Sequence, residues 1–218
     1  MGIIEIDASS KIITISANII CYGNAADYDL AQQIADEIET MWNEPNAIIN
    51  LDNTSYFVRF TIASQYNSVI NAQSIIDNQN PKNNYFRIEE YSNINISCVD
   101  GIGSNTGYFM LANLYKGSTT AAHEFGHSLG LVHPIDLNIV GKGVPGIMYP
   151  RGSLVDQEFQ NDITAKPGEA GGTLNPQNRR VMQIDIDNLK LNKLIEREIF
   201  AVGKFTNQYH AAHVKENV

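Results

Sequence analysis

The sequence HEFGHSLGLVH, at residues 123–133, contains three of the five histidines of this chain. Residues four apart lie on one face of a helix, so His123 and His127 can direct their imidazoles at a single point. Glu124 follows His123 and lies about 100° further around the helix, which places its carboxylate beside that point. The spacing therefore predicts two metal ligands and a neighbouring base on one helix.

Gly130 and His133 complete the arrangement. Glycine adopts the left-handed conformation that ends a helix at little cost, so we expect the helix to end at Gly130. The turn that follows brings His133 to the same point from another direction. Three histidines with an open fourth position are typical of a catalytic zinc ion, whereas a structural zinc site is closed by four protein ligands. The pattern predicts one Zn²⁺ bound by His123, His127 and His133.

Size and charge restrict the remaining possibilities. With 218 residues, of which 43% are hydrophobic, the chain is long enough for one domain with a substantial core. The net charge of −9 argues against nucleic acid or an anionic membrane as the main partner. No apolar run approaches the length of a membrane span. We expect a single-domain monomer, residues 1–218.

The start of the chain and its cysteines bear on the cellular compartment. Residues 1–10 show no basic region followed by an apolar core, so no signal peptide is visible. The alternatives are an intracellular protein, a mature or excised domain, or export by another route, and we predict secretion or delivery outside the producing cell. Cys21 and Cys98 can form one disulfide or remain two buried thiols.

Before residue 120 the pattern predicts strands and one clear helix. Residues 25–43 have apolar side chains at helical spacing after Asn24, a candidate N-cap, with Glu37 and Glu39 expected to face solvent. A β-hairpin is expected from 3–7 and 11–20. Further strands are expected at 47–51, 56–62, 85–91, 94–99 and 108–115, with a second helix as one possibility at 63–77. These elements predict an α+β fold whose upper part is an α/β sandwich with a mixed sheet.

Two segments flank the last of these strands. The glycine-rich loop 100–107 is expected to be a plain turn; a structural Ca²⁺ bound by Asp100 and backbone carbonyls is the alternative. Ser118 or Thr119 is expected to cap the helix 120–129.

The chain after His133 changes in character. Residues 134–166 show little periodicity and many glycines and prolines, so we expect irregular structure along one wall of a cleft. Asn175 and Pro176 predict the start of a long helix that ends near Arg197. The remainder, 198–218, is expected to fray. His210 and His213 are assigned to this exposed tail in preference to a metal site.

A methionine turn follows the histidine motif. Met148 lies in Gly146-Ile147-Met148-Tyr149-Pro150, 15 residues after His133. Together the two features resemble the zinc motif and Met-turn of metzincin metallopeptidases, a resemblance that covers residues 123–150. It implies zinc ligation by the three motif histidines, Glu124 as general base, and Met148 as an apolar floor beneath the imidazoles. It also implies an upper subdomain, about 1–130, and a lower one, about 131–218, with the zinc cleft between them.

The resemblance points to two branches of that family. The histidine motif and Met148-Tyr149-Pro150 are similar to the matrixin version, whereas Pro134 and Asp136 after the third histidine are similar to the serralysin version. Serralysins and astacins have a tyrosine two residues after the methionine that can contact the metal. This chain has Pro150 there and its tyrosine, Tyr149, one residue earlier, so we do not predict a metal-contacting tyrosine.

The predicted function is a zinc-dependent endopeptidase that hydrolyses protein or peptide substrates with water activated by Glu124. Strand 108–115 is expected to be the antiparallel edge that holds an extended substrate. Two alternatives remain open: a peptidase effector or toxin domain of a larger secreted protein, and a non-catalytic zinc-binding module.

Overall fold

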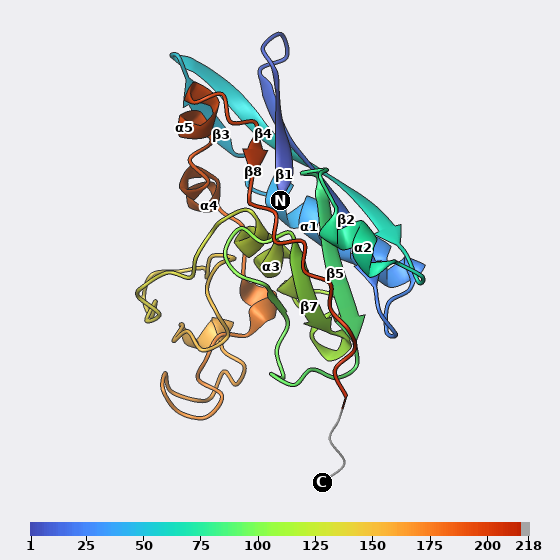
Figure 1. Ribbon diagram of the computed structural model, residues 1–218. Coiled ribbons are helices and arrows are strands. Elements are labelled where there is room, and N and C mark those ends of the chain that lie inside the picture. The colour runs from blue at the N-terminus through green and yellow to red at the C-terminus, as the bar shows by residue number, and fades with distance from the viewer. Residues whose placement is uncertain (215–218) are drawn as a thin grey trace.

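The computed structural model describes residues 1–214 and shows a mixed α/β fold built on a curled, mixed sheet (Figure 1). The strands, in chain order, are β1 (Gly2–Asp7), β2 (Ile12–Tyr22), β3 (Ile48–Leu51), β4 (Thr54–Tyr66), β5 (Asn83–Glu89), β6 (Cys98–Val99), β7 (Thr106–Met110) and β8 (Ala201–Val202). The helices are α1 (Tyr28–Asn43), α2 (Ala72–Ile76), α3 (Thr120–Ser128), α4 (Gln183–Asn188) and α5 (Leu191–Glu196). None of the described helices combines the length and apolarity needed to cross a membrane.

The long strand β2 organises the sheet, whose order is β3-β4-β2-β5-β7-β6. On one side β2 runs parallel to β4. On the other, its first half pairs antiparallel with β1 and its second half pairs parallel with β5. The hairpin of β1 and β2 is therefore confirmed, as is the mixed character of the sheet. Buried side chains of β2 at alternate positions form the centre of the core: Ile13, Ile15, Ala17 and Ile19.

Helix α1 packs on this sheet through the predicted apolar stripe, and Trp42 at its end reaches α3. The indole Nε1 donates to the carbonyl oxygen of Ala122, 3.1 Å away, and the ring packs against Phe60 and Phe125. The helix begins at Tyr28, because Asp27 and not Asn24 is the N-cap and accepts from Leu30 N at 2.7 Å.

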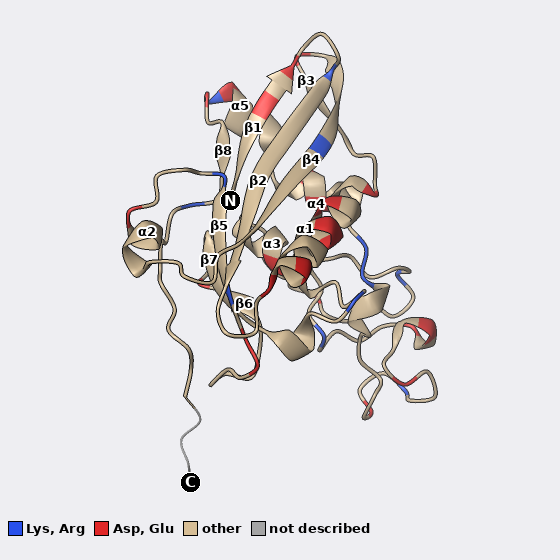
Figure 2. Cartoon of the chain, turned by 90° about the vertical axis from the view of Figure 1, so that its right-hand side faces the viewer, with Lys and Arg blue, Asp and Glu red and all other residues tan. Residues whose placement is uncertain are grey.

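The prediction that Glu37 and Glu39 of α1 face solvent is wrong. Figure 2 shows acidic residues along α1, but Glu37 and Glu39 are only partly exposed. The Glu39 carboxylate accepts from Ile62 N of β4 at 2.6 Å, and that of Glu37 accepts from the first turn of α3. Both side chains satisfy backbone donors of neighbouring elements, which helical periodicity does not reveal.

The strand expected at 108–115 is β7, which ends at Met110 and passes into a 3₁₀ turn, Leu111–Asn113. It is not the antiparallel edge, because it runs parallel to β5 and is covered on its other side by β6. The antiparallel edge strand at this end of the sheet is β6. Gly107 allows this pairing, since a Cβ there would lie 2.7 Å from the carbonyl oxygen of Cys98.

The prediction of one long helix from Pro176 to Arg197 is wrong. Asn175 does cap a turn that begins with Pro176, but this 3₁₀ turn ends at Asn178 and the chain is extended at Arg179. Two short helices, α4 and α5, follow, separated by Lys190 in the left-handed conformation. Four of the apolar residues that suggested one helix are buried: Val181, Ile186, Leu189 and Leu191. Only Ile186 and Leu191 of these lie within α4 and α5, and Ile184 is exposed.

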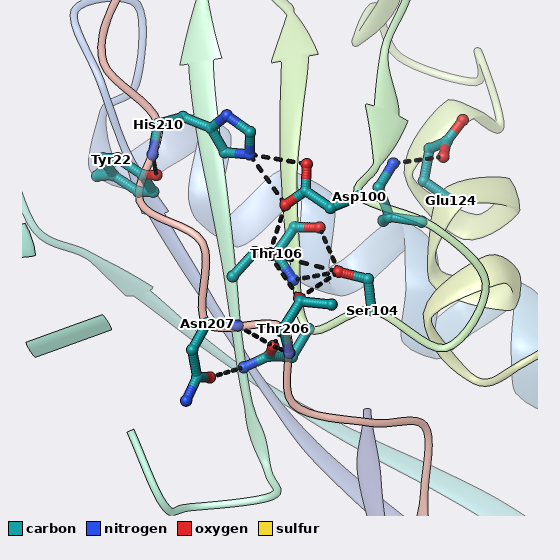
Figure 3. A network of polar contacts seen from close by, with 10 residues as sticks. Tyr22, Asp100, Ser104, Thr106, Glu124, Thr206, Asn207 and His210 are labelled. Atoms are coloured by element: carbon teal, nitrogen blue, oxygen red, sulfur yellow. Dashed lines mark hydrogen bonds and ion pairs between the residues drawn. The ribbon is translucent and has the colours of Figure 1, made fainter. Parts of the chain in front are cut away.

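The C-terminal segment is bound to the sheet as far as the structure describes it, so the expected fraying is wrong there. Strand β8 pairs with β1, and Asn105 Oδ1 accepts from the backbone N–H groups of Thr206 and Asn207. His210 Nε2 lies 2.9 Å from the Asp100 carboxylate (Figure 3), and the ring of His213 stacks on Tyr108. The last part of the predicted tail, 215–218, lies outside the described residues.

Candidate metal centre

The start of α3 is stabilised mainly by a side chain from another helix. Glu37 Oε1 accepts from Ala121 N at 3.1 Å and from Ala122 N at 3.4 Å. Ser118 Oγ accepts from Thr120 N at 3.3 Å, so one of the two predicted caps contributes, whereas the Thr119 hydroxyl donates to Pro176 O. A carboxylate at a helix N-terminus also interacts favourably with the helix dipole. Long-range contacts thus position the helix that carries the motif.

The end of α3 matches the prediction for Gly130, whose φ is +104°. Gly130 N donates to His127 O and Leu131 N donates to Gly126 O, both at 3.0 Å. These two bonds are the Schellman arrangement, in which a left-handed residue ends a helix and satisfies its last carbonyls. The reversal brings His133 back towards the face that carries the other two histidines.

The three motif histidines meet as predicted. His133 Nε2 lies 3.1 Å from His123 Nε2 and 3.0 Å from His127 Nε2. Each offers one ligand nitrogen, and all three nitrogens lie within 4.8 Å of one another. His123 and His127 are buried and His133 is exposed. Among residues 1–214, this is the one group of three or more such side chains that can hold a metal ion.

Backbone carbonyls determine which nitrogens face the centre. His123 Nδ1 lies 2.7 Å from Ile147 O, and His127 Nδ1 lies 2.8 Å from Leu131 O. A carbonyl oxygen only accepts, so both Nδ1 atoms carry the proton and both Nε2 atoms present a lone pair. Burial lowers the pKa of each of the three imidazoles, which favours the neutral form that binds metals.

This arrangement fits a cation. His133 Nε2 carries at most one proton, so at most one of its two short contacts to neighbouring imidazoles can be a hydrogen bond. A metal ion at the common point would accept all three lone pairs. A set of three neutral imidazoles suits zinc and other borderline transition metals better than calcium or magnesium, which prefer oxygen ligands.

Met148 packs against the metal-site helix at Gly126. A Cβ on Gly126 would lie 2.4 Å from Met148 Sδ and 3.1 Å from Trp42 Cζ2. Met148 itself is 3% exposed. The residue before it, Ile147, provides the carbonyl that binds His123. The turn 146–150 therefore both packs on α3 and orients one of its imidazoles.

Glu124 lines the same cavity as the three histidines, a space of about 450 Å³. Its Oε2 accepts from Val99 N of β6 at 3.2 Å (Figure 3). Burial raises the pKa of Glu124 to about 8. The edge strand β6 also lines the cavity through Cys98 and Val99, so the carboxylate lies between the histidines and the free edge of the sheet.

Three further cavity residues were not identified from the sequence: Thr120, Arg151 and Arg179. Arg179 is 3% exposed and donates from Nε to Thr119 Oγ1 at 2.8 Å. Its two other bonds reach the carbonyls of Tyr149 and Ser118. Burial and the neighbouring Arg151 charge lower the pKa of Arg179 to about 10, so it remains charged at neutral pH. No local pattern signals this role, because an arginine after a predicted helix start suggests a solvated side chain.

The other candidate groups have different roles. The Asp100 carboxylate, the expected calcium ligand, accepts from the Thr106 hydroxyl and pairs with His210. His210 and His213 join no metal-binding group within the described residues. Cys21 and Cys98 are free, and burial raises the pKa of their thiols to about 12 and about 11.

A scan against models of protein families and a search of curated proteins found no match to this chain. The structure thus defines a mixed α/β protein with a three-histidine group that can hold a metal ion.

Proposed function

We propose that this chain is a zinc-dependent endopeptidase of the metzincin type, in which His123, His127 and His133 hold the metal and Glu124 is the catalytic base. The observation that carries the proposal is the convergence of three Nε2 atoms on a cavity that also contains a buried carboxylate. A structural metal site needs no such carboxylate, whereas hydrolysis by activated water does.

The metal would have one chemical role. When bound, zinc supplies a Lewis acid that acidifies water and polarises a carbonyl oxygen. The three imidazoles are neutral donors, so they leave the positive charge of the ion available for this task. The Nδ1 bonds to Ile147 O and Leu131 O keep two of the rings in the required tautomer and orientation.

Glu124 moves the proton. Its Oε2 is fixed by Val99 N, while Oε1 has no hydrogen-bond partner in the described part of the chain. Oε1 can therefore accept a proton from the attacking water and pass it to the amine that leaves. Met148 would support the histidines from below through its contact with Gly126.

An extended peptide would bind along β6. This strand is an antiparallel edge of the sheet and lines the cavity next to Glu124, so main-chain pairing would present a peptide bond to the site. We propose that the upper part of the single domain, about 1–130, and the lower part, about 131–218, form the two sides of this cleft.

The test is cleavage of a broad peptide library by the wild-type protein and by Glu124→Gln, with bound zinc quantified in both. We expect one zinc per chain in both proteins and a loss of at least about 10²-fold in cleavage rate for the variant. Glu158→Gln, at an exposed glutamate, is the matched control and should cleave at the wild-type rate. Zinc binding with no cleavage by the wild type would instead establish the non-catalytic zinc-binding module.

A further inference from the structure

The cavity beside the histidines is cationic although the chain is acidic. The protein has a net charge of −9. Among the described residues that line this cavity, two are cations, Arg151 and Arg179, and one is a carboxylate, Glu124. Neither arginine is within ion-pair distance of a carboxylate in the described part of the chain. The Arg151 charge is close enough to contribute to the lowered pKa of Arg179. Glu124 and Glu37 offset part of the Arg179 charge, but neither lies within ion-pair distance of the two arginines, so the pair keeps positive charge for an anion that comes with a ligand.

Arg179 has donors available. Of the five N–H groups of a guanidinium, three are used in bonds to Thr119, Tyr149 and Ser118. Two N–H groups remain on a side chain that is buried and lines the cavity. The three bonds hold the fork in one orientation, which reduces the entropy that it would lose on binding a ligand.

Thr120 supplies an independent observation at the same place. It is the first residue of α3, it is 6% exposed, and it lines the cavity. Its Oγ1 is buried and has no hydrogen-bond partner in the described part of the chain. A buried hydroxyl without a partner costs free energy, so its persistence here suits a bound polar group. It directly follows Ser118 and Thr119 in the chain, two of the three residues to which Arg179 is bonded.

We propose that Thr120, Arg151 and Arg179 form a subsite for a carboxylate of the peptide substrate, the side chain of an aspartate or glutamate close to the cleaved bond. This proposal rests on the peptidase function proposed above. A carboxylate has two acceptor oxygens, which match the remaining guanidinium donors and the threonine hydroxyl. The long-range attraction of Arg151 would direct the acidic residue to the cavity, in a chain whose overall charge repels it.

Arg179 also has a structural part, because its bonds join the start of α3 to the turn that contains Met148. A change at Arg151 tests the binding role of the subsite without disturbing the structural role of Arg179. It is exposed and has no hydrogen-bond or ion-pair partner within the described residues, so its removal should leave the fold intact. Arg197, which is exposed on the segment after α5, is the matched control.

The first arm of the experiment measures kcat/KM for two C-terminally amidated peptides that differ only by glutamate or glutamine at the position preferred in the library. For the wild type we expect a glutamate preference of at least about tenfold, the worth of a charge-assisted hydrogen bond. Arg151→Gln should reduce this preference about threefold, as expected for one exposed charge. Arg197→Gln should retain the full preference. A third peptide, with glutamine and a free C-terminus, tells whether a terminal carboxylate serves as well as a side chain.

The second arm does not depend on turnover. Metal-free Glu124→Gln protein is titrated with the same amidated peptides, and chemical shifts of Thr120 and the Arg151 and Arg179 side chains are followed by NMR. The glutamate peptide should shift them at lower concentration than the glutamine peptide, and Arg151→Gln should narrow that difference. Cleavage without a glutamate preference, or a preference unchanged in Arg151→Gln, would overturn the subsite and leave the peptidase. Selective binding of the glutamate peptide without any cleavage would overturn the peptidase and leave the subsite.

Discussion

The imidazole of His123 is bound through Nδ1 to the carbonyl oxygen of Ile147, 2.7 Å away. Because the carbonyl can only accept, this bond places the His123 proton on Nδ1 and leaves Nε2 free to face the other two histidines. The two residues are 24 positions apart in the chain. The turn that carries Met148 therefore takes part in the metal site through its backbone, in addition to the packing of its methionine.

Metal binding by the histidines should stabilise the folded protein. With free zinc at about 1,000 times the dissociation constant, binding to the native state alone adds about 4 kcal/mol to the free energy of unfolding. Addition of a chelator should therefore lower the Tm of the wild type. His127→Ala should bind no zinc, and its Tm should not respond to the chelator. As control, His213→Ala should retain zinc and the response; a full zinc content in His127→Ala would contradict the ligand assignment.

Gly126 is expected to tolerate a larger side chain only if Met148 is shortened. Alanine is favoured over glycine in a helix by about 1 kcal/mol. In the wild type this gain should be outweighed by the contact of the new Cβ with Met148 Sδ. Gly126→Ala should therefore destabilise the wild type by about 1 kcal/mol, in the range for overpacked cores. In a Met148→Ala background the same change should shift towards stabilisation.

A double-mutant cycle measured by urea unfolding gives the coupling between these two positions. If Gly126→Ala lowers the free energy of unfolding by the same amount with and without Met148, the two residues are not coupled. The contact then does not limit the size of residue 126.

Glu37 should contribute to stability through the start of α3. Glu37→Ala removes the acceptor of the N–H groups of Ala121 and Ala122 and should cost about 1–2 kcal/mol, as the loss of an N-cap does. Asp36→Ala is the neighbouring control, since Asp36 is exposed and makes only a local bond to Gln32. Urea unfolding measures the free energy of unfolding of both variants, and we expect their m-values to equal that of the wild type. Equal, small losses in the two variants would show that Glu37 does not cap α3.

Asp185 should make stability depend on pH. Its Oδ2 accepts from Met182 N at 2.8 Å, and burial raises its pKa to about 6 from the usual 3.8. The native state then holds the proton more tightly than the unfolded state, so the stability that Asp185 contributes is fully present below about pH 4 and is lost as pH rises through about 6. The loss contributed by this residue is about 3 kcal/mol at 1.36 kcal/mol for each pKa unit.

Asp185→Asn can keep the bond to Met182 through its carbonyl oxygen but carries no charge to desolvate. Urea unfolding between pH 4 and pH 7 should show a smaller decrease with rising pH for the variant than for the wild type. If the free energy of unfolding of the two proteins changes equally with pH, Asp185 is not the source of the pH dependence.

The local spacing of residues was sufficient to predict several features. The histidine spacing predicted a helix that ends at Gly130 and a third histidine that returns to the first two, because helical periodicity and the left-handed turn of glycine are local properties. The alternation in 3–20 predicted the hairpin, and the stripe after Asn24 predicted the buried face of α1, with an error of three residues at its start.

Other predictions failed where distant parts of the chain compete with local preference. Residues 176–197 have apolar side chains at helical spacing, yet the bonds from Arg179 to Thr119, Ser118 and Tyr149 accompany an extended chain at Arg179. Glu37 has the position of a solvated residue on α1 but caps α3, 84 residues away. The segment after Val202 is polar and resembles a loose end, yet Asn105 and Asp100 bind it to the sheet.

Residues 123–133 thus determined which side chains meet at a point that can hold a metal ion, since a helix and its glycine end depend on a few neighbouring residues. The environment of that centre was decided by the fold: the tautomers of two histidines, the burial of Glu124 against β6, and the cationic wall of Arg151 and Arg179. Each depends on hydrogen bonds or desolvation between segments that are distant in the chain, and such contacts leave no periodic signal in the sequence.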